Sequence, residues 1–294
     1  MEKLLQWAVN NTDQEDLQRK AEAVRRGELK VDPKRYDPAI IEAILGKDDA
    51  TRMKEAVACI NDKEDTLKNK EIALDNLELL IEGIDNAMNI ENMKLWPSII
   101  AQFSAEEPSL RKGAIWVAGT AVQNNPAAQK ALLKNNGLEP LVAILKKKDE
   151  DKEVRSKAIY AISCFLKHFK EGVEGFESLD GFSALAGILK NEQDPSILRK
   201  VVFSFNSLML ENPQLPNILL AHNIPEVLDG VLVKYTEEGD EDMVEKTLRT
   251  LHTLLTHSKT SPTTDIKKHI EAARTKFGAE YLGLDDAEWT ELLK

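Results

Sequence analysis

A repeat of 44 residues constrains the fold of this chain more than any other feature. Arg111, Arg155 and Arg199 follow one another at intervals of 44 residues, each near the start of a similar segment. The three segments read LRKGAIWVAGTAVQ, VRSKAIYAISCFLK and LRKVVFSFNSLMLE. A period in the low forties with helical patterning is typical of armadillo and HEAT units. Each such unit has an apolar face that only a neighbouring unit can bury, so stacking makes the core.

The downstream half of each unit repeats as well. NNGLEPLVAILK at 135–146 aligns with LDGFSALAGILK at 179–190. Gly137 and Gly181 fall at the same place, and we expect them to form the tight break between two helices. Weaker units flank the three clear ones, which favours an all-α fold. We predict an armadillo-repeat right-handed superhelix of four to five repeats plus capping helices, over residues 35–275.

Charged turns separate the predicted units, and composition supports the helical interpretation. The turns read KKKDEDKE, NEQDPS and TEEGDED, and we expect them to be solvated loops. Aromatic residues make up only 5% of the 294 residues, whereas charged residues make up 30%. Leu, Ala, Lys and Glu dominate, which favours helix over sheet.

Charge and hydrophobicity exclude several classes of function. The net charge is −11, so the chain lacks the basic footprint that a nucleic-acid binder needs. No stretch approaches the ~18 apolar residues of a membrane span. Cys59 and Cys164 lie in apolar helical patterns, and we expect buried thiols in a reducing compartment. The N-terminus has no features of a signal peptide, so we expect a cytoplasmic protein.

The long helix of each unit is expected to line the concave side of the array. Spacing of four residues defines one stripe per helix. The stripes are Arg111, Ile115, Gly119, Gln123; Arg155, Ile159, Ser163, Lys167; and Arg199, Phe203, Ser207, Glu211. Stacking would turn the arginines into a basic row that suits an acidic protein partner. Alternatively, each arginine pairs with an acidic residue of the array itself.

Four stretches carry a resemblance to a known family. They are MEKLLQWAV at 1–9, LELLIEGIDNAMNIENMKLW at 77–96, GTAVQNNP at 119–126 with NNGL at 135–138, and VRSKAIYAISC at 154–164. With them the chain resembles the Fes-type armadillo nucleotide exchange factors of the seventy-kilodalton heat-shock chaperones (DnaK class). The stretches occur in family order and extend to about residue 200.

The resemblance implies a co-chaperone rather than a catalyst. Proteins of this family grip the chaperone's nucleotide-binding domain in the concave face, so that ADP leaves and client polypeptide is released. Such a factor must bind the nucleotide-free state better than the ADP state, and the coupling is reciprocal. No cofactor is implied, and a monomer is expected.

The stripes and the resemblance together predict a set of partner-binding residues. They are Asn86, Ala87, Asn89, Asn92, Arg111, Gly119, Gln123, Asn124, Asn125, Arg155, Ser163, Arg199 and Lys200. Ala87 is small, as expected where a partner approaches, although a polar inter-helix loop is the alternative. The amides of residues 123–125 would end the groove-lining helix, where they can both cap it and reach a partner.

Both ends of the chain are expected to differ from the repeats. Residues 1–34 are predicted to form an N-terminal arm in which Leu4, Leu5 and Trp7 are the functional side chains. In the family the corresponding segment resembles a client and occupies the chaperone's substrate-binding cleft. The alternative is a helix that caps the first repeat. Residues 276–294 are predicted to be a C-terminal tail with a short helix anchored by Trp289.

The sequence argues against two other classes of function. The five histidines form no HExxH or zinc spacing, and no GxxxxGK[ST], GxGxxG or GxSxG occurs, so we predict neither a metal site nor an enzyme. An armadillo-type peptide-binding adaptor or scaffold is the stronger rival. Such adaptors carry a Trp/Asn ladder along the groove. This chain has Gly119, Ser163 and Ser207 at the Asn positions, which counts against capture of an extended peptide.

Overall fold

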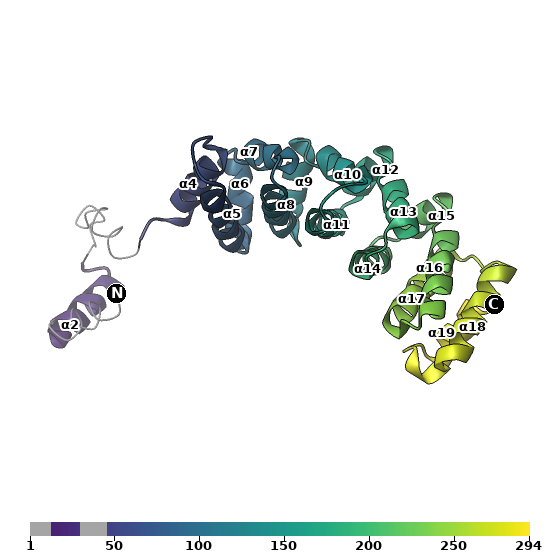
Figure 1. The fold of residues 1–294 in the computed structure, drawn as a ribbon. Coiled ribbons are helices and arrows are strands. Elements are labelled where there is room, and N and C mark those ends of the chain that lie inside the picture. Colours follow the sequence, from purple (N-terminus) through teal and green to yellow (C-terminus); the bar gives the residue numbers. More distant parts are fainter. Residues whose placement is uncertain (1–12, 30–45) are drawn as a thin grey trace. The chain divides into compact units, whose positions relative to one another are not determined.

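The computed structural model describes residues 13–29 and 46–294, and every regular element in these ranges is a helix (Figure 1). The chain divides into two compact units, Met1–Arg52 and Met53–Lys294. In the first unit, α2 (Gln14–Arg25) begins at Asp13, whose side chain accepts hydrogen bonds from two backbone N–H groups of the first turn. Leu4, Leu5 and Trp7 of the predicted arm lie outside the described residues.

The second unit is built from four three-helix repeats between capping helices. The chain enters through α4 (Asp49–Asn61) and α5 (Leu67–Ile81). The repeats are α6 (Ile84–Asn92), α7 (Trp96–Ala101), α8 (Pro108–Val122); α9 (Pro126–Lys134), α10 (Leu138–Lys146), α11 (Lys152–Leu166); α12 (Lys170–Ser178), α13 (Gly181–Asn191), α14 (Pro195–Glu211); and α15 (Leu215–Ala221), α16 (Ile224–Glu238), α17 (Glu241–Ser258). A short 3-10 turn, η2 (Gln102–Ser104), follows α7.

The long third helices form one layer of this unit. Helices α5, α8, α11, α14 and α17 pack consecutively against one another, and α10, α13, α16 and α18 (Thr264–Phe277) pack in the same way behind them. Figure 1 shows α8, α11 and α14 on the inner side of the curve that residues 53–294 follow. The apolar core lies between the two layers. The armadillo arrangement predicted from the repeat is therefore what the structure shows.

The charged turns do more than connect repeats, contrary to the expectation of solvated loops. Asp151, Asp194 and Asp240 each begin a third helix, and their side chains accept hydrogen bonds from backbone N–H groups of the first turn. Such caps are worth about 1 kcal/mol each, because the first N–H groups of a helix lack intrahelical partners. These turns therefore fix where the groove-lining helices start.

The break between the first two helices of a repeat lies one residue earlier than predicted. The left-handed backbone belongs to Asn136 (φ 59°) and Asp180 (φ 58°), whereas the following Gly137 has φ −74°. The glycines are needed for packing instead. A Cβ at Gly137 would lie 2.2 Å from the Leu132 side chain. Glycine at this position lets the second helix approach the first.

The C-terminal residues pack with the repeats as part of the second unit. Helix α19 (Asp286–Leu292) contacts α17, and η3 (Ala279–Tyr281) leads into it. Trp289 is 2% exposed and Leu292 is fully buried, so the indole anchors this helix as expected. The segment at 276–294 therefore caps the last repeat. Within the described ranges, no helix is both long and apolar enough to cross a membrane.

Candidate protein-interaction groove

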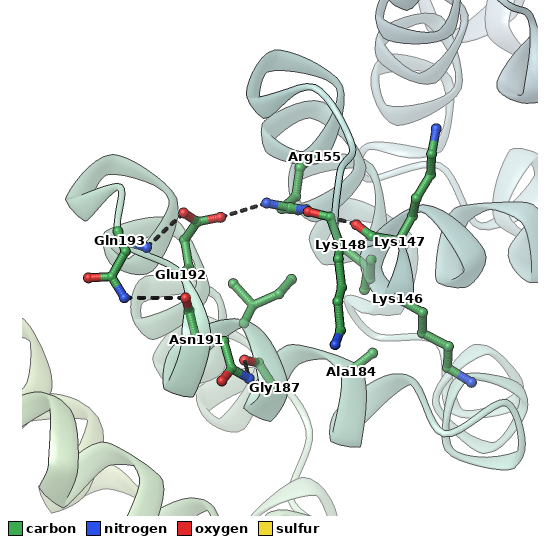
Figure 2. Close-up of a pocket in the computed structure, with 11 residues that line it drawn as sticks. Lys146, Lys147, Lys148, Arg155, Ala184, Gly187, Asn191, Glu192 and Gln193 are labelled. Atoms are coloured by element: carbon green, nitrogen blue, oxygen red, sulfur yellow. Dashed lines mark hydrogen bonds and ion pairs between the residues drawn. The ribbon is translucent and has the colours of Figure 1, made fainter.

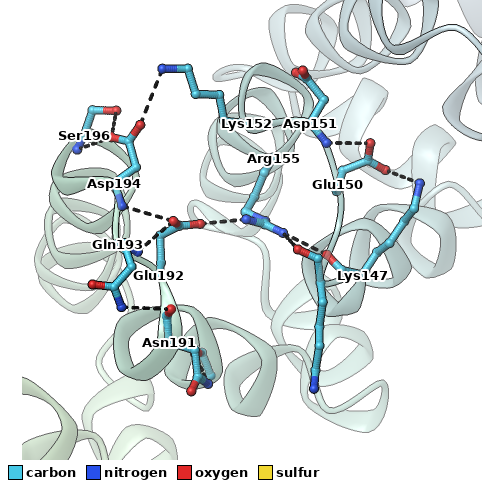
Figure 3. Close-up of polar contacts among 12 residues, drawn as sticks. Lys147, Glu150, Asp151, Lys152, Arg155, Asn191, Glu192, Gln193, Asp194 and Ser196 are labelled. Atoms are coloured by element: carbon cyan, nitrogen blue, oxygen red, sulfur yellow. Dashed lines mark hydrogen bonds and ion pairs between the residues drawn. The ribbon is translucent and has the colours of Figure 1, made fainter.

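Each repeat arginine is held by the turn that begins the next repeat's long helix. Arg155 on α11 donates to Glu192 Oε2 at 2.6 Å, in the turn before α14 (Figure 3). Its second terminal nitrogen donates to the carbonyl oxygens of Lys147 and Lys148, at 2.8 and 2.9 Å. One guanidinium therefore joins the turn before its own helix to the turn before the next. We call the pairing of a repeat arginine with an acidic residue at the start of the next long helix a clamp.

The other two arginines form clamps as well, and Arg111 also contacts the turn before its own helix. Arg111 on α8 pairs with Glu150, and it donates to the carbonyl oxygens of Ala105 and Glu106 at 2.7 and 2.8 Å. Arg199 on α14 pairs with Asp240 and with Asp242, the latter at 2.7 Å. The side chain of Arg111 is only 10% exposed. The expected basic row of arginines is therefore wrong, and the alternative of pairing within the array describes the structure.

The clamps of Arg111 and Arg155 keep their carboxylates ionised. Burial acts to raise the pKa of Glu150, but hydrogen bonds from Arg111, a backbone N–H and Lys147 outweigh it and lower the pKa. For Glu192, burial is again outweighed, by two backbone N–H groups and Arg155, so its pKa is also lowered. The charges are thus satisfied inside the protein, and they fix the spacing of the repeats.

Ile115 and Gly119 of the predicted stripe on α8 face the neighbouring helix rather than the groove. Ile115 is fully buried, and a Cβ at Gly119 would lie 2.7 Å from the Tyr160 ring on α11. Because α5 and α11 flank α8 and the outer layer lies behind it, the open face of α8 must carry its partly exposed residues. Beyond the first turn, those are Lys112, Trp116 and Thr120, each one position after a stripe residue. The arginines therefore do not mark the open face of α8.

A pocket of about 430 Å³ lies on the open face of α11 and α14. It is lined by Gln123, Asn124, Ile159, Tyr160, Ser163, Cys164, Lys167, Lys200, Phe203, Ser204 and Ser207. The Tyr160 hydroxyl lies 3.4 Å from Gln123 Oε1, to which it donates a hydrogen bond. Burial raises the pKa of Tyr160 to about 12, so the phenol stays a neutral donor. Phe203, which lines the pocket, is 62% exposed.

The amides after α8 divide between this pocket and the interior. Gln123 and Asn124 are exposed and line the pocket, and Asn124 adopts left-handed backbone with φ 51°. Asn125 is 4% exposed, and its side chain accepts a hydrogen bond from the Ala128 N–H at 3.2 Å. Asn125 therefore caps α9, and direct contact with a partner was wrongly predicted for it. Two of the three amides remain available.

The predicted residues of α6 have a similarly mixed outcome. Ala87 is 3% exposed and belongs to the apolar core, so the predicted contact with a partner is wrong. Asn86 donates to the Leu80 carbonyl oxygen at 2.8 Å and ties α6 to the end of α5. Asn89 and Asn92 hydrogen-bond to each other at 3.1 Å, and Asn92 is exposed. The periodicity of this helix buries Ala87 and presents the asparagines.

Ser163 and Gln129 connect helices within the stack. The Ser163 and Ser204 hydroxyl oxygens lie 2.6 Å apart, between α11 and α14. Gln129 of α9 is 3% exposed, and its amide nitrogen donates to the carbonyl oxygens of residues 164, 165 and 167, at 3.1, 3.0 and 2.9 Å. Sequence reasoning missed Gln129, because a single amide in a short helix carries no pattern.

A second pocket, of about 530 Å³, lies beside the Arg155 clamp (Figure 2). It is rich in lysine, but two of its three lysine ammonium groups already have intramolecular partners. Lys146 Nζ donates to the Leu179 carbonyl oxygen at 2.8 Å, and Lys147 Nζ lies 3.2 Å from Glu150 Oε2. Within the described part of the chain, no group of three or more His, Cys, Asp or Glu could hold a metal ion. The pocket between α11 and α14 is therefore the better candidate for a binding site.

Comparisons with known proteins identify the family. Residues 1–90 match the family model described as nucleotide exchange factor Fes1. Residues 86–227 match the SIL1/FES1/HPBP1 C-terminal domain. The chain belongs to the Fes1 family. The resemblance seen in the sequence is thereby confirmed.

Curated relatives of this Fes1-family chain are named Hsp70 nucleotide exchange factors. The protein from Debaryomyces hansenii is 40% identical over 217 residues, which cover 72% of this chain and 71% of that protein. The Schizosaccharomyces pombe protein is 38% identical over 226 residues, covering 75% and 77%. The Saccharomyces cerevisiae protein is 34% identical over 266 residues, covering 87% and 86%.

Solved structures similar to this chain are armadillo-repeat proteins. A designed armadillo repeat protein in complex with the peptide (KR)4 has a TM-score of 0.62 at 15% identity, and the match covers 82% of this chain and 96% of that one. An engineered protein has a TM-score of 0.63 at 16% identity, covering 82% and 94%. At such identities the likeness confirms the armadillo fold alone.

Proposed function

We propose that this chain is a nucleotide exchange factor that promotes release of ADP from an Hsp70-class chaperone and, as a consequence, release of its client. Membership of the Fes1 family carries this proposal, because relatives that match across most of their length are named for that activity. The chaperone's nucleotide-binding domain would be gripped by the open face of α8, α11 and α14. Such a factor would act as a cytoplasmic monomer.

The clamped stack supports a mechanism in which the factor is rigid and the chaperone yields. Arg111, Arg155 and Arg199 fix the spacing of successive long helices, so the open face is formed before a partner arrives. A preorganised surface loses little entropy on binding. Its binding energy is then available to stabilise the loosened, nucleotide-free form of the partner. Reciprocity requires that ADP weaken the binding of the factor.

The proposed contacts are the predicted residues that remain accessible. Gln123, Asn124 and Lys200 line the pocket on α11 and α14, and Asn92 is exposed on α6. Amides can pair with backbone groups of either polarity, and lysine supplies charge. The N-terminal side chains Leu4, Leu5 and Trp7 would act separately, on the chaperone's substrate-binding domain.

The test is stopped-flow release of a fluorescent ADP analogue from a cytosolic Hsp70, with and without the full chain. We expect acceleration by the wild-type protein and most of it lost in the Asn124→Arg/Lys200→Glu double variant. The matched control is Lys190→Glu, at an exposed lysine on α13 in the outer layer. No acceleration by the wild type at any concentration would overturn the exchange function and leave the adaptor alternative, to be tested by pull-down.

A second set of variants separates the two domains of the chaperone. Substitution of Leu4, Leu5 and Trp7 by alanine in the full chain should leave ADP release unchanged and slow the release of a labelled client peptide. If this variant no longer accelerated ADP release from the chaperone, a separate role for the arm would be contradicted.

A further inference from the structure

Three lysines on the open face lack the acidic partners that the neighbouring arginines have. Lys112, Lys157 and Lys200 lie about one repeat apart, on α8, α11 and α14. Lys112 and Lys200 each follow a clamped arginine directly, and Lys157 follows one by two positions. Among residues 13–29 and 46–294, no carboxylate forms an ion pair with any of these three lysines, whereas every clamp arginine has one. A basic row therefore exists, but it consists of lysines.

Lys157 is the central member and has the most unusual surroundings. Its Nζ lies 3.3 Å from the centroid of the Trp116 ring and 5.8 Å from that of Tyr160. The faces of aromatic rings attract cations, so the two rings hold the ammonium group at a defined place. Burial lowers the pKa of Lys157, as do the charges of Lys112 and Lys200.

Glu78 and, more weakly, Glu153 are the carboxylates whose charges act on Lys157, but the Glu78 carboxylate has another hydrogen-bonding partner. Its charge acts to raise the pKa of Lys157, yet the net direction remains downward. Glu78 Oε1 accepts a hydrogen bond from the Thr120 hydroxyl at 2.7 Å, and the residue is 8% exposed. The ammonium of Lys157 is thus partly desolvated while no carboxylate is paired with it.

We infer that Lys112, Lys157 and Lys200 form a binding strip for an acidic surface of the chaperone's nucleotide-binding domain, with Lys157 as its centre and exposed Phe203 as an apolar anchor. This inference rests on the proposed function and adds the chemistry of the partner surface. Opposite charge across an interface guides encounter and fixes register. The chain as a whole carries a net charge of −11, which disfavours a nucleic acid as the partner of these lysines. A local acidic patch on a folded protein is then the partner that fits them.

The surroundings of Lys157 make it the strongest of the three lysines. A charge that pairs across an interface must first lose water, and this cost reduces the gain from pairing. In Lys157 part of that cost is already present in the free protein, because Trp116 and the neighbouring helix exclude solvent from one side. A partner carboxylate that pairs with Lys157 therefore gains more binding free energy than one that pairs with the more exposed Lys200. Phe203, 62% exposed beside the pocket, adds an apolar contact of the kind that dominates interface energy.

The test measures the affinity of full-length variants for nucleotide-free Hsp70 at several salt concentrations. We expect Lys157→Met to weaken binding about 30-fold, as for loss of one partner of a desolvated charge pair. Lys112→Ala and Lys200→Ala should each weaken it about 3-fold, as for exposed pairs. The matched control, Lys190→Ala on α13, should bind as the wild type does. The variant that combines these three lysine substitutions should also show a flatter dependence of affinity on salt concentration.

Two further measurements separate charge from packing. Lys157→Arg keeps the cation on the aromatic rings and should bind within about 3-fold of the wild type. Lys157→Met should unfold within about 2 °C of the wild type, because it keeps the aliphatic contact with Trp116. Lys157→Met removes both the favourable cation–π attraction and the unfavourable burial of the ammonium group. These two changes have opposite effects on the free energy of unfolding.

The outcomes distinguish this inference from the function on which it rests. A wild-type chain that neither binds Hsp70 nor accelerates ADP release overturns both. If the wild type binds Hsp70 and accelerates ADP release, and Lys157→Met binds equally well, only the inference about the lysine strip is overturned. Equal weakening by the Lys190→Ala control would also overturn it, because general charge would then explain the effect.

Discussion

Gly119 on α8 and Tyr160 on α11 pack so closely that no side chain fits between them. A Cβ at Gly119 would lie 2.7 Å from a Tyr160 ring carbon and 3.1 Å from the Cα of Ala161. The residue at position 119 therefore sets how closely two groove-lining helices approach, and it also sets where the Tyr160 ring lies beside the pocket. A glycine that looked like an open groove position in the sequence is a spacing residue.

Gly119→Ala should destabilise the protein by about 1–2 kcal/mol, because overpacking outweighs the better helix propensity of alanine. Urea unfolding would measure this change. The matched control is Gly230→Ala in α16, where a Cβ would meet nothing within 4 Å. That variant should be more stable by up to about 1 kcal/mol. A stabilised Gly119→Ala would contradict the close packing.

Arg155→Ala should cost about 3 kcal/mol, because it leaves Glu192 and two backbone carbonyl groups without their donor. The side chains of Arg155 and Glu192 are only 11% and 16% exposed, so solvent replaces the contacts poorly. Lys170→Ala breaks an exposed pair with Glu174 on α12 and should leave the urea midpoint unchanged. Equal effects of the two variants would show that burial of the clamp does not matter.

The clamps should make the protein sensitive to acid. The pKa values of Glu150 and Glu192 are lowered in the folded protein, so the unfolded chain binds protons more readily. Their stabilisation is complete above the unfolded pKa and is lost as the pH falls through the folded pKa. We expect the urea midpoint to fall below about pH 5. Glu192→Gln should be less stable near neutral pH and should show a shallower pH dependence.

Gln129→Ala should lower stability by about 2 kcal/mol, because three carbonyl groups at the end of α11 lose their shared donor. Hydrogen exchange of the last turn of α11 should also become faster. Gln123→Ala, at an exposed amide of the neighbouring turn, is the control and should leave both measurements unchanged. An unaltered Gln129→Ala protein would mean that water replaces the amide.

Ala87→Arg should disrupt α6 rather than only block a partner. The side chain is 3% exposed, and a buried guanidinium without a partner would cost more than about 3 kcal/mol. Asn92→Arg on the same helix is exposed and should fold normally. Circular dichroism melting of both variants would decide the matter. A fully stable Ala87→Arg protein would show that α6 can rearrange.

The repeat period was sufficient to predict the architecture, because it reports which faces of successive helices need one another. It did not locate the breaks. Asn136 and Asp180 adopt the left-handed backbone, and Gly137 is required by the proximity of Leu132. A glycine can be required by left-handed backbone or by close packing. The sequence alone cannot separate these two reasons here, because both occur at the same turn.

The groove was harder to predict than the fold, since a shift of one residue on a helix turns a side chain by about 100°. Arg111 was placed on the open face, yet Lys112 is there. The acidic partner of Arg111 is Glu150, in a turn that seemed merely solvated. The repeat does contain a signal for this face, because a lysine follows the arginine within two positions in all three units.

Each clamp spans a junction between repeats, so each of the two middle repeats carries one half of two clamps. A repeat supplies the arginine for the junction that follows and the acid for the junction that precedes it. Duplication or deletion of one complete unit during evolution would therefore close the remaining junctions correctly. A partial insertion would leave an orphaned charge in the interior. The array can thus change length only in whole modules, and its reach around a partner can change only in steps of one repeat.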